Sequence, residues 1–278
     1  MKSDEIDFVA EVARAGAGLA VDRDKLYLIE SRLAPVARRE GFGAIREMLL
    51  AARQKRESKL MWAVVEALAS GETSFFRDNG VFERFRTEML PALAKAGDHR
   101  TIRVWSAGCG SGQEAYSLAL VMDEAGVFAS GRDAYVLGSD LSERALEKAR
   151  TGLFTQFEVQ RGLPIRALVE HFEKQDELWA VSPRIQSHVR WRRVNLNADI
   201  RGVGRFEVVF CRNVVWAMEA AAKSRLLEQL ADAVEPGGYL VLGQEETAEE
   251  LGADFARMDA GVYQRDARVA ARSQAVMI

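Results

Sequence analysis

Hydrophobic and polar positions alternate with helical spacing through about the first 70 residues of the chain. Between Leu26 and Val36, apolar residues fall at i, i+3, i+7 and i+10, which predicts an amphipathic helix capped by Asp22 or Asp24. Two further helices are predicted over residues 44–53 and 57–69. Because no strand pattern occurs here, residues 1–70 are expected to form a small all-α domain.

From Thr101 onward the pattern changes to short β-rich runs that alternate with helical stretches. The runs are IRVWSA, AYVLGSD, VRWRRVNL, FEVVFCRNV and GYLVLGQE. This alternation is typical of a parallel sheet with crossover helices, so an α/β domain is predicted over residues 101–268. The stretch from Gly152 to His188 is less regular and suggests an insertion.

The segment between the two predicted domains, residues 71–100, contains GETSFFRD and then a predicted helix from Val81 to about Lys95. Pro91 is expected to interrupt this helix early in its second half, because proline lacks a backbone N–H. At the other end of the chain, the alanine-rich residues 269–278 are expected to form a frayed tail.

Composition narrows the class of protein. Hydrophobic residues make up 48% and charged residues 28%, which suits a globular protein with a real core. No apolar run approaches the roughly 20 residues of a membrane span, and the start MKSDEIDF lacks a signal-peptide core. The scattered 2 cysteines and 3 histidines predict neither a metal site nor a disulfide framework, so a cytoplasmic protein is expected. A net charge of −3 argues against a dedicated nucleic-acid binder.

The stretch RVWSAGCGSGQEAYSLAL, residues 103–120, is the leading candidate for a ligand site. It predicts a strand, a tight loop with Gly108, Gly110 and Gly112, and a helix from Gln113. Glycines permit positive φ angles and close approach of a ligand, and the helix start supplies free N–H groups. A plain glycine turn is the alternative, but the α/β context favours a nucleotide or adenosine site.

Asp140 ends the next predicted strand, 140 − 112 = 28 residues after Gly112. This spacing is near the roughly 20 residues expected for an acid that binds a ribose hydroxyl pair. A carboxylate at that place accepts both hydroxyl hydrogens and so favours an adenosine ligand. Alternatively, Asp140 is the N-cap of the helix in LSERALEKAR, a role for which Ser142 competes.

Glu114 lies in the first turn after the glycine loop, where a dinucleotide would place its pyrophosphate. A carboxylate repels phosphate but suits an ammonium or sulfonium group, and S-adenosylmethionine (SAM) carries both. Together with Asp140, Glu114 therefore favours SAM over a dinucleotide. The alternative is that Glu114 only complements the helix dipole.

With these motifs, the chain resembles the chemotaxis receptor methyltransferases, the CheR type of protein-glutamate O-methyltransferase. The matching motifs, in order, are GETSFFRD, RVWSAGCGSGQEAYSLAL, GSDLSERALEKARTGLF, FEVVFCRNV and EPGGYLVLGQEE. The resemblance covers about residues 5–265. It implies an α/β, Rossmann-like class I SAM methyltransferase domain that follows an all-α N-terminal domain. It also implies a small antiparallel β-subdomain within about residues 152–193.

The resemblance also implies site residues. Those for the cofactor are Thr73, Arg77, Gly108, Gly110, Gly112, Glu114, Asp140, Asn195, Leu196, Asn213 and Val214. Glu114 would take the amino group of SAM and Asp140 its ribose. Residues 195–196 would flank the adenine, and residues 213–214 would line the methyl-transfer cleft. The product would be S-adenosylhomocysteine (SAH), and the partner the cytoplasmic helical region of chemoreceptors. A monomer without metal, nucleic acid or membrane insertion is expected.

Three positions depart from the family pattern. Gly71 replaces an asparagine, Gln113 replaces the first of two glutamates, and Ala217 replaces the tyrosine that faces the transferred methyl group. The missing tyrosine suggests a slow enzyme. It also leaves open a SAM-binding regulatory protein without turnover, or a methyltransferase for another protein or small-molecule acceptor.

Carboxylate methylation requires few catalytic groups, because a glutamate side chain is already ionised at pH 7. An arginine that orients this carboxylate in a bidentate manner is the most useful residue, and Arg77 is the catalytic candidate. The alternative for Arg77 is a hinge arginine that pairs with Asp78 or Glu72.

A basic stripe on the predicted all-α domain is a candidate docking surface. Lys25, Arg32 and Arg39 recur every seven residues, and residues 23–59 hold ten basic against five acidic residues. This surface would steer a glutamate-bearing receptor helix. The alternative is an ordinary solvated helix face.

Overall fold

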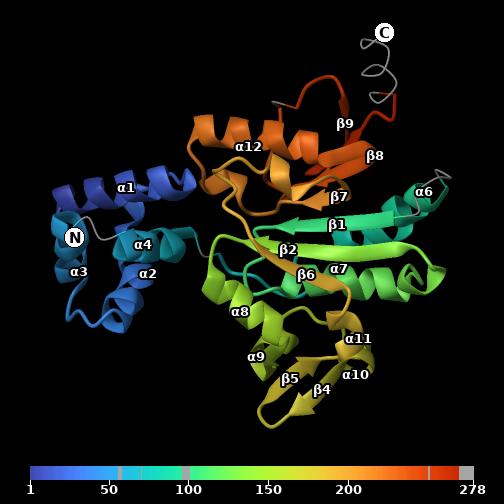
Figure 1. Cartoon of the computed structure of the whole chain (residues 1–278), viewed down its shortest axis with the longest axis horizontal. Coiled ribbons are helices and arrows are strands. Elements are labelled where there is room, and N and C mark those ends of the chain that lie inside the picture. Colours follow the sequence, from blue (N-terminus) through green and yellow to red (C-terminus); the bar gives the residue numbers. More distant parts are fainter. Residues whose placement is uncertain (56–57, 70, 96–100, 250, 269–278) are drawn as a thin grey trace.

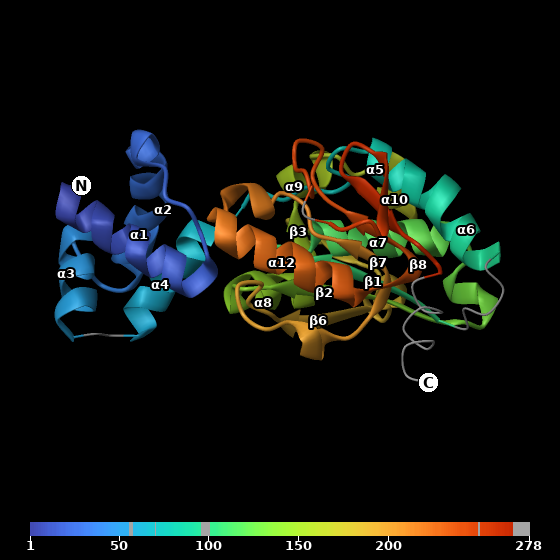
Figure 2. The ribbon, with the colours of Figure 1, turned by 90° about the horizontal axis from the view of Figure 1, so that it is seen from above.

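The protein consists of a helical part that lies beside one end of a larger α/β part (Figure 1). The computed structural model describes residues 1–55, 58–69, 71–95, 101–249 and 251–268. The predicted tail, residues 269–278, lies outside the described residues, as does residue 57 of the third predicted helix. The helical part and the C-terminal end of α6 lie at opposite ends of the molecule in both views (Figures 1 and 2).

Among its described residues, the helical part contains one 3-10 turn and four helices. They are α1 (Ser3–Ala17), η1 (Arg23–Lys25), α2 (Leu26–Arg39), α3 (Ile45–Lys55) and α4 (Ser58–Ala69). Their apolar faces form one core that includes Val9, Leu33 and Val64. Asp22 caps η1 rather than α2, because its carboxylate accepts a hydrogen bond from the Asp24 N–H.

The segment after the linker is helical but irregular. It consists of α5 (Gly80–Arg84), the π-helix η2 (Phe85–Met89) and α6 (Leu90–Lys95). The irregular turn therefore precedes Pro91 instead of starting at it. Proline has no N–H for the carbonyl four residues earlier, and the helix widens before it, so that the Leu90 N–H donates to the Phe85 carbonyl.

The α/β part is built on a seven-stranded sheet with the order β6-β2-β1-β7-β8-β10-β9. The strands are β1 (Thr101–Ala107), β2 (Asp133–Asp140), β6 (Val189–Arg193), β7 (Phe206–Phe210), β8 (Val234–Val241), β9 (Phe255–Asp259) and β10 (Val262–Arg265). The first five in spatial order run parallel, β10 runs antiparallel to β8, and β9 runs antiparallel to β10. The predicted α/β fold with a mainly parallel sheet is confirmed.

Helices cover both faces of this sheet. They are α7 (Gln113–Glu124), α8 (Glu143–Thr151) and α12 (Ala220–Ala233). Alternate residues of the strands point to opposite faces, so Val104 joins the core under α7 while Trp105 joins the core under α12. The carboxyl ends of β1 and β2 point toward the helical part (Figure 1).

A small antiparallel sheet interrupts the α/β part. Its strand order is β3-β5-β4, with β3 (Leu153–Thr155), β4 (Phe172–Gln175) and β5 (Leu178–Val181). Three short helices accompany it: α9 (Gln156–Gln160), α10 (Ile165–His171) and α11 (Pro183–Gln186). This sheet confirms the expected β-subdomain, although β6 at the end of the stretch belongs to the main sheet.

In the described residues, no helix is long and apolar enough to cross a membrane.

Backbone hydrogen bonds tie the helical part to the α/β part. After α1, Gly18 adopts a left-handed conformation (φ 67°), and a Cβ there would lie 2.6 Å from Asn197 Oδ1. The Ala20 N–H then donates to the Ala217 carbonyl (2.8 Å), and the Glu219 N–H donates to the Gly18 carbonyl (2.8 Å). The two parts therefore meet next to the carboxyl end of the sheet.

Candidate functional site

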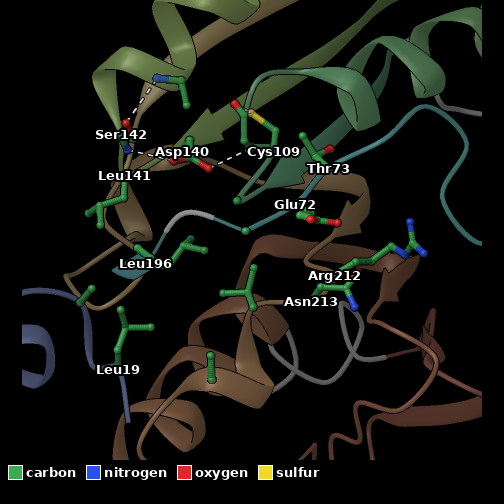
Figure 3. Close-up of a pocket in the computed structure, with 18 of the residues that line it drawn as sticks. Leu19, Glu72, Thr73, Cys109, Asp140, Leu141, Ser142, Leu196, Arg212 and Asn213 are labelled. Carbon is green, nitrogen blue, oxygen red and sulfur yellow. Dashed lines mark hydrogen bonds between the residues drawn. The ribbon is translucent and has the colours of Figure 1, made fainter. Parts of the chain in front are cut away.

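A cavity of about 340 Å³ lies where these two parts meet. Its walls come from the ends of β1, β2, β6 and β7, from the linker before α5 and from the segment after α1. The chain turns in opposite directions from β1 toward β2 and toward β7, and this reversal is where open α/β sheets bind ligands. In Figure 3, Leu19 and Leu196 lie on one side of the cavity, and Arg212 and Asn213 on the other.

The glycine loop joins β1 to α7 along the cavity wall. Gly108, Gly110 and Gly112 all have positive φ angles, of 78°, 56° and 95°. A Cβ on Gly108 would lie 2.7 Å from Val214 Cγ2, and one on Gly110 would lie 3.1 Å from Thr73 Cγ2. Glycine is therefore needed for the turn, and it also lets the linker and the segment after β7 come close.

The Asp140 carboxylate, at the end of β2, holds this loop. Its Oδ2 accepts from the Gly110 N–H (2.8 Å) and its Oδ1 from the Ser142 N–H (2.9 Å). Ser142, not Asp140, is the N-cap of α8, so the capping interpretation of Asp140 is wrong. Burial raises the pKa of Asp140, against the lowering effect of these hydrogen bonds. Burial also raises the pKa of the neighbouring Cys109 thiol well above its usual value.

Glu114 lies opposite a buried arginine that the sequence analysis did not single out. Its Oε1 accepts from Ser106 Oγ (2.7 Å), and its Oε2 accepts from Arg212 Nη1 (3.1 Å). Arg212 Nη2 donates to Asp78 Oδ2 (2.5 Å), and the Arg212 side chain is only 2% exposed. Its Nε has no hydrogen-bond partner among the described residues. The cavity thus holds an anion and a cation side by side.

The linker brings Thr73 and Arg77 to the cavity. Arg77 is exposed, and its Nη1 donates to the Glu72 carbonyl (2.8 Å). Arg77 does not pair with the carboxylate of Asp78 or of Glu72. The Asp78 carboxylate binds Arg212 instead, and the Glu72 carboxylate binds Arg161 (2.8 Å). Most of the five N–H donors of a guanidinium are thus left for another group.

Residues 195–196 and 213–214 also reach the cavity. The Asn195 Nδ2 donates to the Gly16 carbonyl of α1 (2.7 Å), so this side chain joins the two parts of the protein. Asn213 adopts a left-handed conformation with φ 59°. Trp216 and Ala217 follow it along the wall, and the Trp216 Nε1–H donates to the Asn213 carbonyl (3.2 Å).

The three residues of the basic stripe have different partners in the structure. Arg32 lines the cavity and its Nη1 donates to the Leu68 carbonyl (2.7 Å). Lys25 belongs to η1 rather than α2, and its Nζ lies 3.1 Å from Asp22 Oδ2. Arg39 Nε donates to Glu40 Oε1 (3.0 Å). All three basic residues are exposed, but only Arg32 reaches the cavity.

The fold and the cavity define a Rossmann-like domain of the SAM-dependent methyltransferase class. More specifically, residues 71–263 match the family described as "CheR methyltransferase, SAM binding domain", and the chain belongs to this family. The resemblance stated from the motifs is thereby confirmed.

Curated relatives agree with this assignment over most of the chain. Chemotaxis protein methyltransferase 1 of Pseudomonas aeruginosa is 35% identical over 84% of this chain and 86% of its own length. Chemotaxis protein methyltransferase Cher2 of Pseudomonas putida is 33% identical over the same shares. Chemotaxis protein methyltransferase 1 of Vibrio cholerae is 32% identical over 86% of this chain and 87% of its own length.

Solved structures overlap with the chain only in part. The PKMT2 protein of Rickettsia typhi is 15% identical, with a TM-score of 0.37 over 62% of this chain and 26% of that one. The N-methyltransferase NodS of Bradyrhizobium japonicum is 16% identical, with a TM-score of 0.33 over 58% and 61%. Because these structures match only part of the chain, the family assignment depends on the sequence match alone.

Proposed function

We propose that this protein transfers the methyl group of SAM to glutamate side chains of chemoreceptors, giving glutamate methyl esters and SAH. The observation that carries the proposal is the pair of opposite charges in the cavity, Glu114 beside Arg212, with the Asp140 carboxylate bound to the middle of the glycine loop. The amino acid end of SAM carries an ammonium and a carboxylate, which this pair complements. The unpaired Nε of Arg212 adds a buried donor to the same place.

The residues that line the cavity support the remaining proposed cofactor contacts. Each oxygen of Asp140 already accepts one N–H and keeps a lone pair for a ribose hydroxyl. Residues 195–196 would flank the adenine, with Leu196 supplying the apolar surface. Thr73 and Gly108–Gly112 would contact the cofactor from the linker and loop, and residues 213–214 would line the methyl-transfer side.

The proposed reaction needs orientation more than acid–base chemistry. SAM supplies an activated methyl group on a sulfonium, and the acceptor carboxylate is ionised at neutral pH without a general base. Exclusion of water and an in-line approach are then the main contributions of the protein. Arg77, exposed at the cavity with one donor used by the Glu72 carbonyl, is the proposed catalytic residue that orients the acceptor carboxylate.

The acceptor is proposed to approach across α2. Lys25, Leu28, Arg32, Pro35 and Arg39 are all exposed on one side of η1 and α2. Arg32 connects this surface to the cavity, so a helix docked there would lie next to the reacting methyl group. The basic charges suit the acidic, cytoplasmic helical region of a chemoreceptor, and we propose that a monomer acts on it in the cytoplasm.

Transfer of radiolabel from SAM to receptor-containing membranes tests the proposal. The expected product is a base-labile label on the receptor, as a methyl ester gives. SAH binding without any transfer would instead support a SAM-binding regulatory protein, which Ala217 in place of tyrosine motivates. Transfer to another protein or to a small molecule, but to no receptor, would replace the acceptor class.

A further inference from the structure

Glu246 lies behind the cavity wall and binds the wall from outside. Its side chain is buried, with 4% exposure. Its Oε2 accepts from the N–H groups of Gly243 (2.7 Å) and Asn213 (2.9 Å), and its Oε1 accepts from the Trp216 N–H (3.1 Å). Asn213 and Trp216 line the cavity, whereas Glu246 does not. Glu246 therefore contacts the cavity wall through the backbone of these two residues.

The segment held in this way, residues 213–217, begins with Asn213 in a left-handed conformation and ends in the short 3-10 helix η5 (Val215–Ala217). Asn213 adopts a positive φ of 59°, which asparagine tolerates better than most residues but which still costs energy. Gly243 leaves no space for a side chain, because a Cβ there would lie 2.8 Å from Glu246 Oε2. At its other end, the segment is fixed by the hydrogen bond from the Ala20 N–H to the Ala217 carbonyl.

We propose that Glu246 is a positioning residue that sets residues 213–217 for methyl transfer. A buried carboxylate is costly unless it is hydrogen-bonded, and three backbone N–H groups compensate it here. The contacts exist whatever the acceptor is. Only the effect on transfer depends on the function proposed above.

The carboxylate is needed because both of its oxygens accept. Glutamine has the same shape but only one acceptor oxygen, which is best placed at Oε2, where it serves two donors. Its NH2 group then faces the Trp216 N–H, and that hydrogen bond is lost. Glu246→Gln should thus release the Trp216–Ala217 end of the segment and keep the Asn213 end.

Hydrogen exchange of the full chain, read by mass spectrometry and NMR, tests this directly. In the wild type, the amide hydrogens of Asn213, Trp216 and Gly243 should exchange slowly although none of these residues lies in an α-helix or a strand. In Glu246→Gln, exchange at Trp216 and Ala217 should become faster. Glu245→Gln, a change at the exposed neighbouring residue, is the matched control and should behave as the wild type.

Kinetics and calorimetry complete the test. Glu246→Gln should lower kcat on the order of 10²-fold, as expected for a misplaced reacting geometry, with SAH affinity and receptor KM almost unchanged. Wild-type kcat in this variant, or a lower kcat without faster exchange, would overturn the proposal. If the variant does not fold, fast exchange of all three amides in the wild type overturns it, and slow exchange supports it. Absence of transfer in the wild type would contradict the proposed function but leave the exchange result decisive.

Discussion

Arg212 Nη1 lies 3.1 Å from Glu114 Oε2 inside the cavity, although the two residues are 98 positions apart in the chain. The same guanidinium binds Asp78 of the linker, 134 positions away. Arg212 is therefore the point where the glycine-loop helix, the segment after β7 and the linker meet. A ligand carboxylate that binds Arg212 would therefore also contact the hydrogen bonds that hold the linker in place.

Arg212→Lys should weaken SAH binding by about 1.5–3 kcal/mol, the range for hydrogen bonds to charged groups. Lysine keeps the charge, but its single ammonium cannot hold Glu114, Asp78 and a carboxylate ligand in a fixed plane. Isothermal titration calorimetry with SAH measures the effect. Arg166→Lys, in an exposed pair with Glu170, is the control and should bind normally. If Arg212→Lys binds SAH with the affinity of the wild type, the assignment of Arg212 to the cofactor site is wrong.

Asp140→Ala should weaken SAM and SAH alike, by about 1.5–3 kcal/mol, because the ribose is common to both ligands. The variant also frees the Gly110 and Ser142 N–H groups, so Asp140→Asn, which keeps an acceptor, should lose less. Asp133→Ala, at the exposed start of the same strand, is the control. If calorimetry gives both Asp140 variants the same affinity for SAM and SAH as the wild type, the ribose assignment is wrong.

Asp140 also predicts a pH dependence of stability. Its pKa is raised in the folded protein, mainly by burial, so the folded state binds this proton more tightly than the unfolded state. Its contribution to stability is therefore present at pH values below the unfolded pKa, and is lost as the pH rises through the folded pKa. In Asp140→Asn, the unfolding free energy without ligand should lack this contribution. Denaturant titrations of both proteins from acid to neutral pH measure the difference, and parallel curves would contradict the prediction.

The sequence predicted the features whose signal is local. Asp140 follows a strand and the glycine loop precedes a helix, so parallel-sheet geometry alone brings them to one edge. Helix boundaries such as those of α2 follow from apolar spacing. The π-turn before Pro91 was not predicted, because the pattern indicates that a helix is disturbed but not on which side of the proline the backbone widens.

Arg212 and Glu246 were missed because their partners are distant in the chain. An arginine and a glutamate are exposed in most proteins, and no local pattern marks these two as buried. The one available signal for Arg212 was its position at the carboxyl end of a buried strand, directly before Asn213. For Glu246, the glycine at 243 was the only hint of close packing.

Charge reversal of Lys25 and Arg39 should raise the KM for receptor and leave SAM binding unchanged, because neither residue lines the cavity. Arg32→Glu should raise KM further, since Arg32 also borders the cavity. The effects should shrink at high salt, where exposed charges are screened. Initial rates at several receptor concentrations and two ionic strengths measure this. Arg166→Glu on the β-subdomain is the control, and unchanged kinetics at low salt would restore the solvated-face interpretation.

Ala217→Tyr should raise kcat with little change in SAM affinity. Ala217 borders the cavity, and its backbone carbonyl accepts from the Ala20 N–H, so the substitution adds a side chain without removing this contact. Trp216 does not replace the missing hydroxyl. It is 69% exposed, and its Nε1–H, which can only donate, is used by the Asn213 carbonyl.

The size of the increase in kcat shows whether the tyrosine hydroxyl orients the reacting groups or the ring only fills space. A single orienting group is worth about 10²–10³ in rate, which sets the upper limit of the expected increase. Ala217→Phe adds the ring without the hydroxyl, so it should recover only the part of the gain that comes from excluding water. Single-turnover rates with saturating SAM compare the three proteins. If the wild type transfers no methyl group to any receptor and Ala217→Tyr does not restore transfer, the protein is a SAM-binding regulator instead of an enzyme.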